Sequence, residues 1–224
     1  MSAMSRFVRS CLSVVALLVL PLVSLAASPV INQPAMPYAP LAINALIEQE
    51  QLYLGQLIGD PHMYEVSLDE ERTLTLTLVQ SDAGESDLPF SLIVVRDNDN
   101  HRGVTEIGRL TGKDIEWKSY YDAALALSLR RSETVEYVLA PGVYRFEVST
   151  SENLGKYLIV LGTESDDDAG YFTKLGDIRL VQDFFDASFF RIFISSYVLY
   201  PLGTLILIAL IYLTWRRQRI LPHA

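Results

Sequence analysis

The feature that most constrains this chain is an uncharged run near its C-terminus. Residues 192–215 contain no charged side chain in 24 consecutive positions. Basic residues flank this run on both sides: Arg191 before it, and Arg216, Arg217 and Arg219 after it. At a rise of about 1.5 Å per residue, a helix of this length crosses a hydrocarbon core of about 30 Å. The sequence therefore predicts one transmembrane helix over residues 192–215 and a basic tail over residues 216–224.

The N-terminus indicates that the chain is exported. Arg6 and Arg9 precede an apolar stretch over residues 11–25, and small residues follow it, which is the layout of a secretory signal peptide. We expect residues 1–27 to be this signal; the alternative is an uncleaved N-terminal membrane helix. In both cases the segment 28–190 lies outside, and the tail arginines stay in the cytoplasm, as the positive-inside tendency predicts.

The exported segment is acidic and has no cysteine. Residues 28–190 carry 12 basic and 27 acidic side chains, a formal charge of −15, which disfavours nucleic acid and anionic headgroups as partners. The one cysteine of the chain, Cys11, lies in the predicted signal, so no disulfide can hold the exported part. This fits a bacterial envelope protein better than a eukaryotic ectodomain. We expect a single-pass protein of the bacterial inner (cytoplasmic) membrane, with its N-terminal domain in the periplasm.

The exported segment has the patterns of an all-β domain. Residues 28–41 contain four prolines and predict an extended spacer. In residues 73–79 leucine alternates with threonine, which places Leu74, Leu76 and Leu78 on one face of a half-buried strand. Similar short runs recur between turn-forming clusters, at 63–68, 91–95, 125–129, 135–139, 143–149 and 157–161. We expect an antiparallel β-sandwich or jelly roll over residues 42–163, with a hairpin turn at Ala140-Pro141-Gly142.

Two parts of this domain resemble a known family. Residues 55–66 read GQLIGDPHMYEV, residues 139–148 read LAPGVYRFEV, and residues 155–160 read GKYLIV. These stretches resemble the opening and closing strands of bacterial pre-peptidase C-terminal domains, over about residues 52–162. The resemblance implies a small jelly-roll-like module that binds or positions something and has no catalytic centre of its own. The peptidase that usually accompanies this module does not fit in the remaining chain, so the resemblance leaves the partner open.

The connector to the span has two predicted parts. Residues 164–176 begin with an acidic run and predict a flexible linker, and residues 177–191 predict an amphipathic helix next to the membrane. The favoured interpretation places the aromatic residues of this helix in the interfacial layer or against a partner's helix; the alternative packs them under the sandwich. The outer half of the span could pair with another helix or form an interfacial belt. The predicted docking residues are Phe184, Phe185, Phe189, Phe190, Tyr197, Tyr200 and Gly203.

Residues that could carry chemistry are few. Three histidines, His62, His101 and His223, and no cysteine outside the signal are a poor basis for a transition-metal site, and no Gly-x-Ser-x-Gly elbow singles out a nucleophile. We therefore expect no catalytic residue and no cofactor.

Calcium is the one metal that the sequence leaves open. Asp97 and Asp99 start like an EF-hand, but Arg102 and Gly108 occupy the positions where that loop needs Gly and Glu. A looser calcium site would join Asp97 and Asp99 to residues 166–168. The alternative is an ordinary turn, because Asn and Asp satisfy their own backbone there.

A cluster of aromatic residues is the remaining candidate. Trp117, Tyr120 and Tyr121 could form a platform for a sugar or a peptide, because flat rings stack on apolar ligand faces. The alternative is that these rings pack in the core.

These observations favour a non-catalytic bitopic membrane protein. We expect an accessory or interaction module of an envelope membrane complex or transporter, docked through the juxtamembrane helix and the span. A periplasmic module that binds a glycan or a peptide is the alternative, and a hydrolase with an unrecognised site is the third. The sequence leaves the oligomeric state open.

Overall fold

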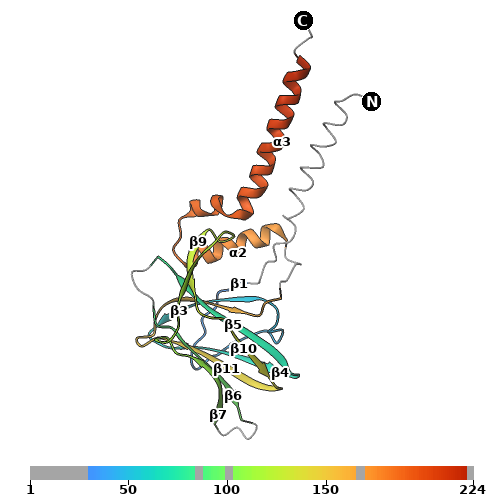
Figure 1. Cartoon of the computed structure of the whole chain (residues 1–224). Helices are drawn as coiled ribbons and strands as arrows, with labels where there is room; N and C mark the ends of the chain where they lie inside the picture. The colour runs from blue at the N-terminus through green and yellow to red at the C-terminus, as the bar shows by residue number, and fades with distance from the viewer. Residues whose placement is uncertain (1–29, 84–87, 99–102, 165–169, 221–224) are drawn as a thin grey trace.

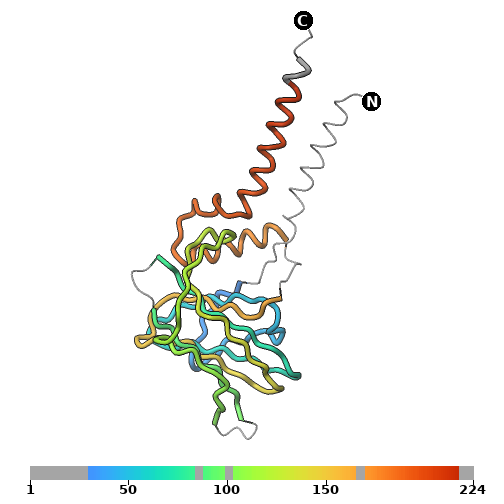
Figure 2. Tube along the Cα trace, viewed as in Figure 1, coloured from blue at the N-terminus to red at the C-terminus, as the bar shows by residue number. Residues whose placement is uncertain are grey.

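The computed structural model describes residues 30–83, 88–98, 103–164 and 170–220. Within them, two β-sheets pack face to face, followed by α2 (Tyr171–Phe184), the 3₁₀ helix η2 (Phe189–Ile194) and α3 (Ser196–Ile220). In Figure 1 and Figure 2, α2 lies between the sandwich and α3. The predicted signal peptide, residues 1–27, lies outside the described residues.

Each sheet has a short parallel pair at one edge and is otherwise antiparallel. The strands of the seven-stranded sheet are β1 (Val30–Ile31), β3 (Gln51–Ile58), β12 (Leu154–Leu161), β5 (Arg72–Ser81), β9 (Leu127–Arg131) and β8 (Lys118–Asp122), in this order, with β10 (Val135–Leu139) also paired to β5. The strands of the five-stranded sheet are, in order, β2 (Leu41–Ala42), β4 (His62–Leu68), β11 (Gly142–Ser149), β6 (Ser91–Asp97) and β7 (Val104–Leu110). The all-β sandwich predicted from the strand patterns is confirmed.

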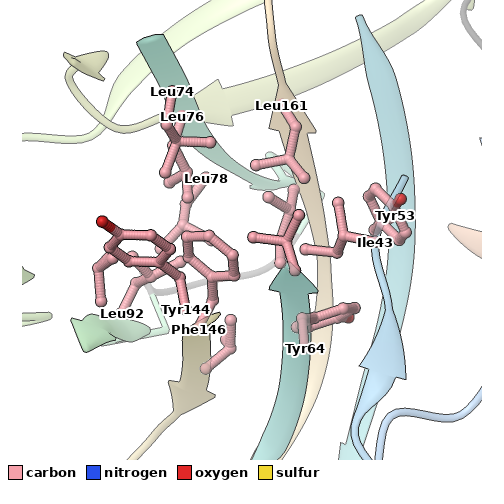
Figure 3. Packing of buried hydrophobic residues seen from close by; sticks show 14 of the residues in the cluster. Ile43, Tyr53, Tyr64, Leu74, Leu76, Leu78, Leu92, Tyr144, Phe146 and Leu161 are labelled. Carbon is pink, nitrogen blue, oxygen red and sulfur yellow. The ribbon is translucent and has the colours of Figure 1, made fainter. Parts of the chain in front are cut away.

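The core lies between the two sheets and follows the alternation of the strands. Leu74, Leu76 and Leu78 on β5 are fully buried, as the leucine–threonine pattern predicts. Across the core they face the aromatic side chains of β11, including Tyr144 and Phe146 (Figure 3). Each such side chain stabilises the fold by roughly 1.5–3 kcal/mol relative to an exposed position. This burial stabilises the sandwich without disulfides, because residues 28–190 contain no cysteine.

Two expectations about local structure were wrong. The predicted spacer 28–41 is not free over its described residues 30–41, because β1 and β2 add to the sheet edges and Ala35 is fully buried in the core. The turn at residues 140–142 does not join a hairpin: β10 pairs with β5 in one sheet, and β11 pairs with β4 and β6 in the other. The turn therefore carries the chain between the sheets. Gly142 makes this crossing with a φ of 153°, which favours glycine.

The predicted amphipathic helix over residues 177–191 has different bounds. α2 begins at Tyr171, inside the predicted linker 164–176, and ends at Phe184. Asp186 has a φ of 57° and breaks the helix, and the Ser188 side chain accepts a hydrogen bond from the Phe190 amide at the start of η2. The chain thus turns twice between residues 185 and 196. Residues 192–195, assigned to the predicted span, belong to η2 and this second turn.

The predicted membrane span has the required length and composition. The segment Ser196–Arg216 of α3 is long and apolar enough to cross a membrane, and its most apolar window has no buried residue. Arg216 lies exposed at the far end of this segment, with Arg217 and Arg219 following it in the helix. A single-pass membrane protein is therefore consistent with the fold.

Candidate functional site

The candidate site is the junction between the sandwich and α3. Helix α2 lies on the outer face of the seven-stranded sheet and buries Ile178, Val181 and Phe185. The last two pack against an apolar row on that face, which includes Leu54 and Val79. The favoured interpretation, which turned the aromatic residues of this helix toward lipid or a partner, was wrong for Phe185. The outer face of this sheet is apolar, and α2 packs on it and removes part of it from water.

A four-residue loop between β8 and β9 holds the connector, and we call residues 123–126 the clasp loop. Its four consecutive carbonyl oxygens each accept a hydrogen bond from the segment that leads into α3. The donors, in order, are Ser196 N to Ala123 O (2.8 Å), Ser195 Oγ to Ala124 O, Gln182 Nε2 to Leu125 O (2.7 Å) and Arg191 Nη1 to Ala126 O (2.9 Å). The clasp loop thus binds the end of α2, η2 and the start of α3 together.

Hydrogen bonds within the clasp loop determine its shape. One carboxylate oxygen of Asp122 accepts hydrogen bonds from the amides of Ala124 and Leu125, both at 2.9 Å. Ala126 completes the turn with a φ of 53°. These bonds satisfy two of the four loop amides internally, and the loop carbonyls remain available as acceptors. No side-chain pattern marks this arrangement, because the acceptors are backbone atoms.

A further hydrogen bond joins the two ends of the connector. Pro201 lies in the second turn of α3 and has no amide hydrogen, so the carbonyl of Tyr197 lacks its helical donor. The hydroxyl of Tyr171, the first residue of α2, donates to this oxygen at 2.8 Å. Tyr197 itself is buried against the sandwich side of the junction, so this predicted docking residue is not exposed.

One exposed apolar surface of the junction lies on η2. Phe189, Phe190 and Phe193 are 58%, 75% and 51% exposed, and we call these three residues the Phe patch. The Arg179 guanidinium lies 5.1 Å from the centre of the Phe189 ring and orients it. Of the other predicted docking residues, Tyr200 and Gly203 are exposed on α3, whereas Phe184 is half-buried and Phe185 is buried.

A cavity of about 360 Å³ lies beside α2 on the outer face of the seven-stranded sheet. Its apolar lining comes mainly from the sheet and from α2: Val30, Leu52, Val79, Leu158, Val160, Ile178 and Val181. Its charged lining combines both signs: Glu50, Asp122, Arg131, Lys174 and Asp177. Burial raises the pKa of the Asp177 carboxyl above its ordinary value. Lys174 was not among the residues predicted from the sequence, although it lies four residues before Ile178 and so continues the buried stripe of α2.

The predicted aromatic platform is not assembled. Trp117 packs at the edge of the inter-sheet core, and Tyr120 packs on the opposite, outer face of the seven-stranded sheet. Tyr121 is 56% exposed and, as the next residue of β8, points away from Tyr120. The three rings therefore do not lie together on one face of the sheet. The Arg131 guanidinium lies 5.1 Å from the Tyr120 ring, and burial raises the pKa of Tyr120 to about 12.

The predicted calcium residues are described only in part. Asp97 ends β6 and pairs with Arg145 at 2.8 Å, so one of its oxygens is already engaged. Asp99 and residues 166–168 lie outside the described residues. In the part of the chain that the structure describes, no three carboxylate, histidine or cysteine side chains gather as a metal site would require.

A polar cluster inside the core surrounds His62, which is the one histidine among the residues that the structure describes. The Tyr157 hydroxyl lies 2.8 Å from His62 Nδ1 and 2.9 Å from the Tyr64 hydroxyl. Burial lowers the pKa of His62 and raises the pKa of Tyr64 to about 12. These shifts keep both groups neutral near pH 7, and the hydrogen bonds satisfy them inside the core.

The solved structures that match this chain include two β-sandwich domains of low sequence identity. The pre-peptidase C-terminal domain of collagenase from Bacillus anthracis matches at 11% identity with a TM-score of 0.31, over 62% of this chain and 95% of that chain. The sandwich is similar to this domain. CBM35 from Cellvibrio japonicus Abf62 matches at 15% identity with a TM-score of 0.25, over 62% of this chain and 90% of that chain. No protein-family model and no curated protein matches the sequence.

Proposed function

We propose that this chain is a non-catalytic single-pass membrane protein that acts as an accessory or interaction module of an envelope membrane complex or transporter. The sandwich stands in the periplasm, and the basic tail lies in the cytoplasm. The non-catalytic role rests on the sequence, in which no nucleophile, metal set or cofactor motif stands out.

The hydrogen-bonded clasp is the observation that carries this proposal. A domain that only needs to stay near the membrane can hang on a flexible linker. Here the clasp loop, Tyr171 and the buried face of α2 tie the sandwich to the first turns of α3. This arrangement supports a role in which the orientation of the sandwich relative to the span matters. A partner that contacts both parts at once needs such an orientation.

The same arrangement supports a docking surface at the level where α3 leaves the sandwich. The Phe patch is exposed and adjoins the outer half of α3, which presents Tyr200 and Gly203. A grouped set of exposed aromatic side chains is typical of an interaction surface. Gly203 has open space around its Cα, so a neighbouring helix can approach the backbone closely there.

Purification of the full-length chain in mild detergent tests the proposal. We expect a stoichiometric membrane protein to copurify with the native chain and to be lost from the double variant Phe190→Ser, Phe193→Ser. Tyr121→Ser is the matched control, because Tyr121 is an exposed aromatic residue on the sandwich, and it should retain the partner.

Exchange of the anchor gives an independent result. We expect replacement of residues 189–215 by an unrelated span to abolish copurification while the chain stays in the membrane. Retention of the partner on the unrelated anchor, or purification of the native chain without any stoichiometric partner, would contradict the proposed role.

A further inference from the structure

The cavity beside α2 has an apolar floor that the protein leaves partly uncovered. Strand register places Leu52, Val160 and Thr77 side by side across β3, β12 and β5. The next row, which contains Leu158 and Val79, is buried under α2. Leu52 and Val160 remain half-buried and line the cavity. A ligand with an apolar portion would remove this surface from water, which favours its binding.

The polar lining of the cavity matches a group that carries both charges. Lys174 reaches it from α2, and Arg131 reaches it from β9, so two cations from different elements face the same space. Glu50, Asp122 and Asp177 supply carboxylates to the same lining. A phosphate can accept hydrogen bonds from both cations, and an ammonium group can donate hydrogen bonds to the carboxylates. The ring of Tyr120 supports the Arg131 guanidinium at 5.1 Å.

The position of the cavity indicates the source of such a ligand. Tyr197, the second residue of α3, is part of its lining, so the cavity lies where the chain leaves the sandwich for the span. This is the level of the lipid headgroups when α3 crosses a bilayer. We propose that the cavity binds a membrane lipid with a zwitterionic phosphate–amine headgroup, with an acyl chain along Leu52 and Val160 and the phosphate between Lys174 and Arg131.

This site is separate from the proposed docking surface. No residue of the Phe patch lines the cavity, so loss of lipid binding and loss of a protein partner can be measured independently. A lipid held against α2 would also cover the half-buried floor that the sandwich and α2 leave open.

Photolabelling of the full-length chain in detergent micelles tests the proposal. The probe is lysophosphatidylethanolamine with a diazirine at the end of its acyl chain, and the labelled peptides are identified by mass spectrometry. We expect saturable labelling of β3, β12 or α2. Val160→Trp, which fills the floor, should lower it about tenfold. Val138→Trp is the matched control, because Val138 is exposed on β10 and does not line the cavity.

Recognition of the headgroup is tested with a variant that does not fill the cavity. The double variant Lys174→Gln, Arg131→Gln should lower labelling by the phosphate-bearing probe about tenfold. A monoacylglycerol probe with the same diazirine chain should label the native chain about tenfold less than the phospholipid probe. Circular dichroism melting of each variant confirms that the sandwich is folded before labelling is compared.

Three results would overturn the proposal. Equal labelling by the phospholipid and monoacylglycerol probes would remove headgroup recognition. Labelling confined to α3 would show only ordinary contact with the micelle. Competition by free phosphoethanolamine as strong as competition by the unlabelled lysophospholipid would identify a soluble ligand in place of a lipid.

Discussion

At the scale of single residues, the contact between Gly55 and Tyr157 shows how closely the core is packed. The two residues are direct partners on β3 and β12. A methyl group at Gly55 would lie 2.2 Å from Cζ of the Tyr157 ring, which is anchored by hydrogen bonds to His62 and Tyr64. Glycine is needed here for space, because a side chain at this position would displace the whole cluster.

Substitution of Gly55 is therefore expected to lower the stability of the sandwich. Gly55→Ala should lower the free energy of unfolding by about 1–3 kcal/mol, because the ring must move away from its hydrogen-bond partners. The measurement is denaturant unfolding of the full chain in detergent. Gly176→Ala is the control: it has open space on α2, and alanine there should raise the stability of the helix by up to about 1 kcal/mol. Equal effects of the two substitutions would show that the predicted steric contact does not form.

His62 makes the stability of the sandwich dependent on pH. Burial lowers its pKa in the folded state, so below about pH 6.5 the unfolded chain binds a proton that the folded chain does not. The contribution of neutral His62 is complete above the unfolded pKa and falls as the pH decreases toward the folded pKa. The slope from this one group is at most about 1.4 kcal/mol per pH unit.

Comparison with a variant that cannot titrate isolates this effect. His62→Gln should remove the part of the pH dependence that lies just below pH 6.5, although it lowers stability at every pH. The measurement is the thermal midpoint of the β-sheet circular dichroism signal between pH 5 and 8. Parallel pH profiles of the native chain and the variant would show that His62 does not contribute.

At the scale of elements, the junction depends on contacts between residues that lie far apart in the sequence. Pro201 removes a donor from α3, and Tyr171, 30 positions earlier, replaces it at the Tyr197 carbonyl. The two residues should therefore be coupled in energy although they lie on different helices.

A double-mutant cycle measures this coupling. Tyr171→Phe should cost about 1 kcal/mol in the native chain, because it leaves the Tyr197 carbonyl without its donor. In a Pro201→Ala background the cost should fall, because the new amide of residue 201 takes the carbonyl. Hydrogen exchange of the α2 amides in detergent is the measurement. Additive effects of the two substitutions would exclude the proposed replacement of the donor.

At the scale of the whole molecule, the two outer faces of the sandwich differ. The outer face of the seven-stranded sheet is covered by α2 and the membrane connector. The outer face of the five-stranded sheet carries ion pairs, with Arg145 joined to Glu65 at 2.9 Å and to Asp97 at 2.8 Å. In Figure 1 the β6–β7 hairpin points away from α3. The sandwich therefore has one face toward α3 and an opposite face that carries ion pairs.

This polarity leads to a topology prediction. In a Cys11→Ser background, Ser67→Cys on the solvent side should react with a membrane-impermeant maleimide in cells whose outer membrane is permeabilised. Ala224→Cys at the C-terminal end should react only after the inner membrane is opened. Labelling of Ala224→Cys in intact inner membranes would reverse the proposed orientation, and recovery of the full chain in the soluble fraction would remove the membrane assignment.

The sequence alone determined the features that depend on neighbouring residues. The alternation at Leu74, Leu76 and Leu78 predicts which face of β5 is buried, and the uncharged run predicts the helix that can span a membrane. Both follow from the period of a single element and its contact with an apolar surrounding, so they can be read without knowing the fold.

Only the tertiary structure decided how these elements meet. The sequence could not show that β10 and β11 enter different sheets, because pairing depends on strands distant in the chain. The buried stripe of α2 was visible as a pattern, but its partner, the outer face of the seven-stranded sheet, was not. The clasp loop left no side-chain signal at all, because backbone carbonyls of residues 123–126 make its bonds. Backbone groups are the same at every position, so only the path of the folded chain decides which of them face a donor.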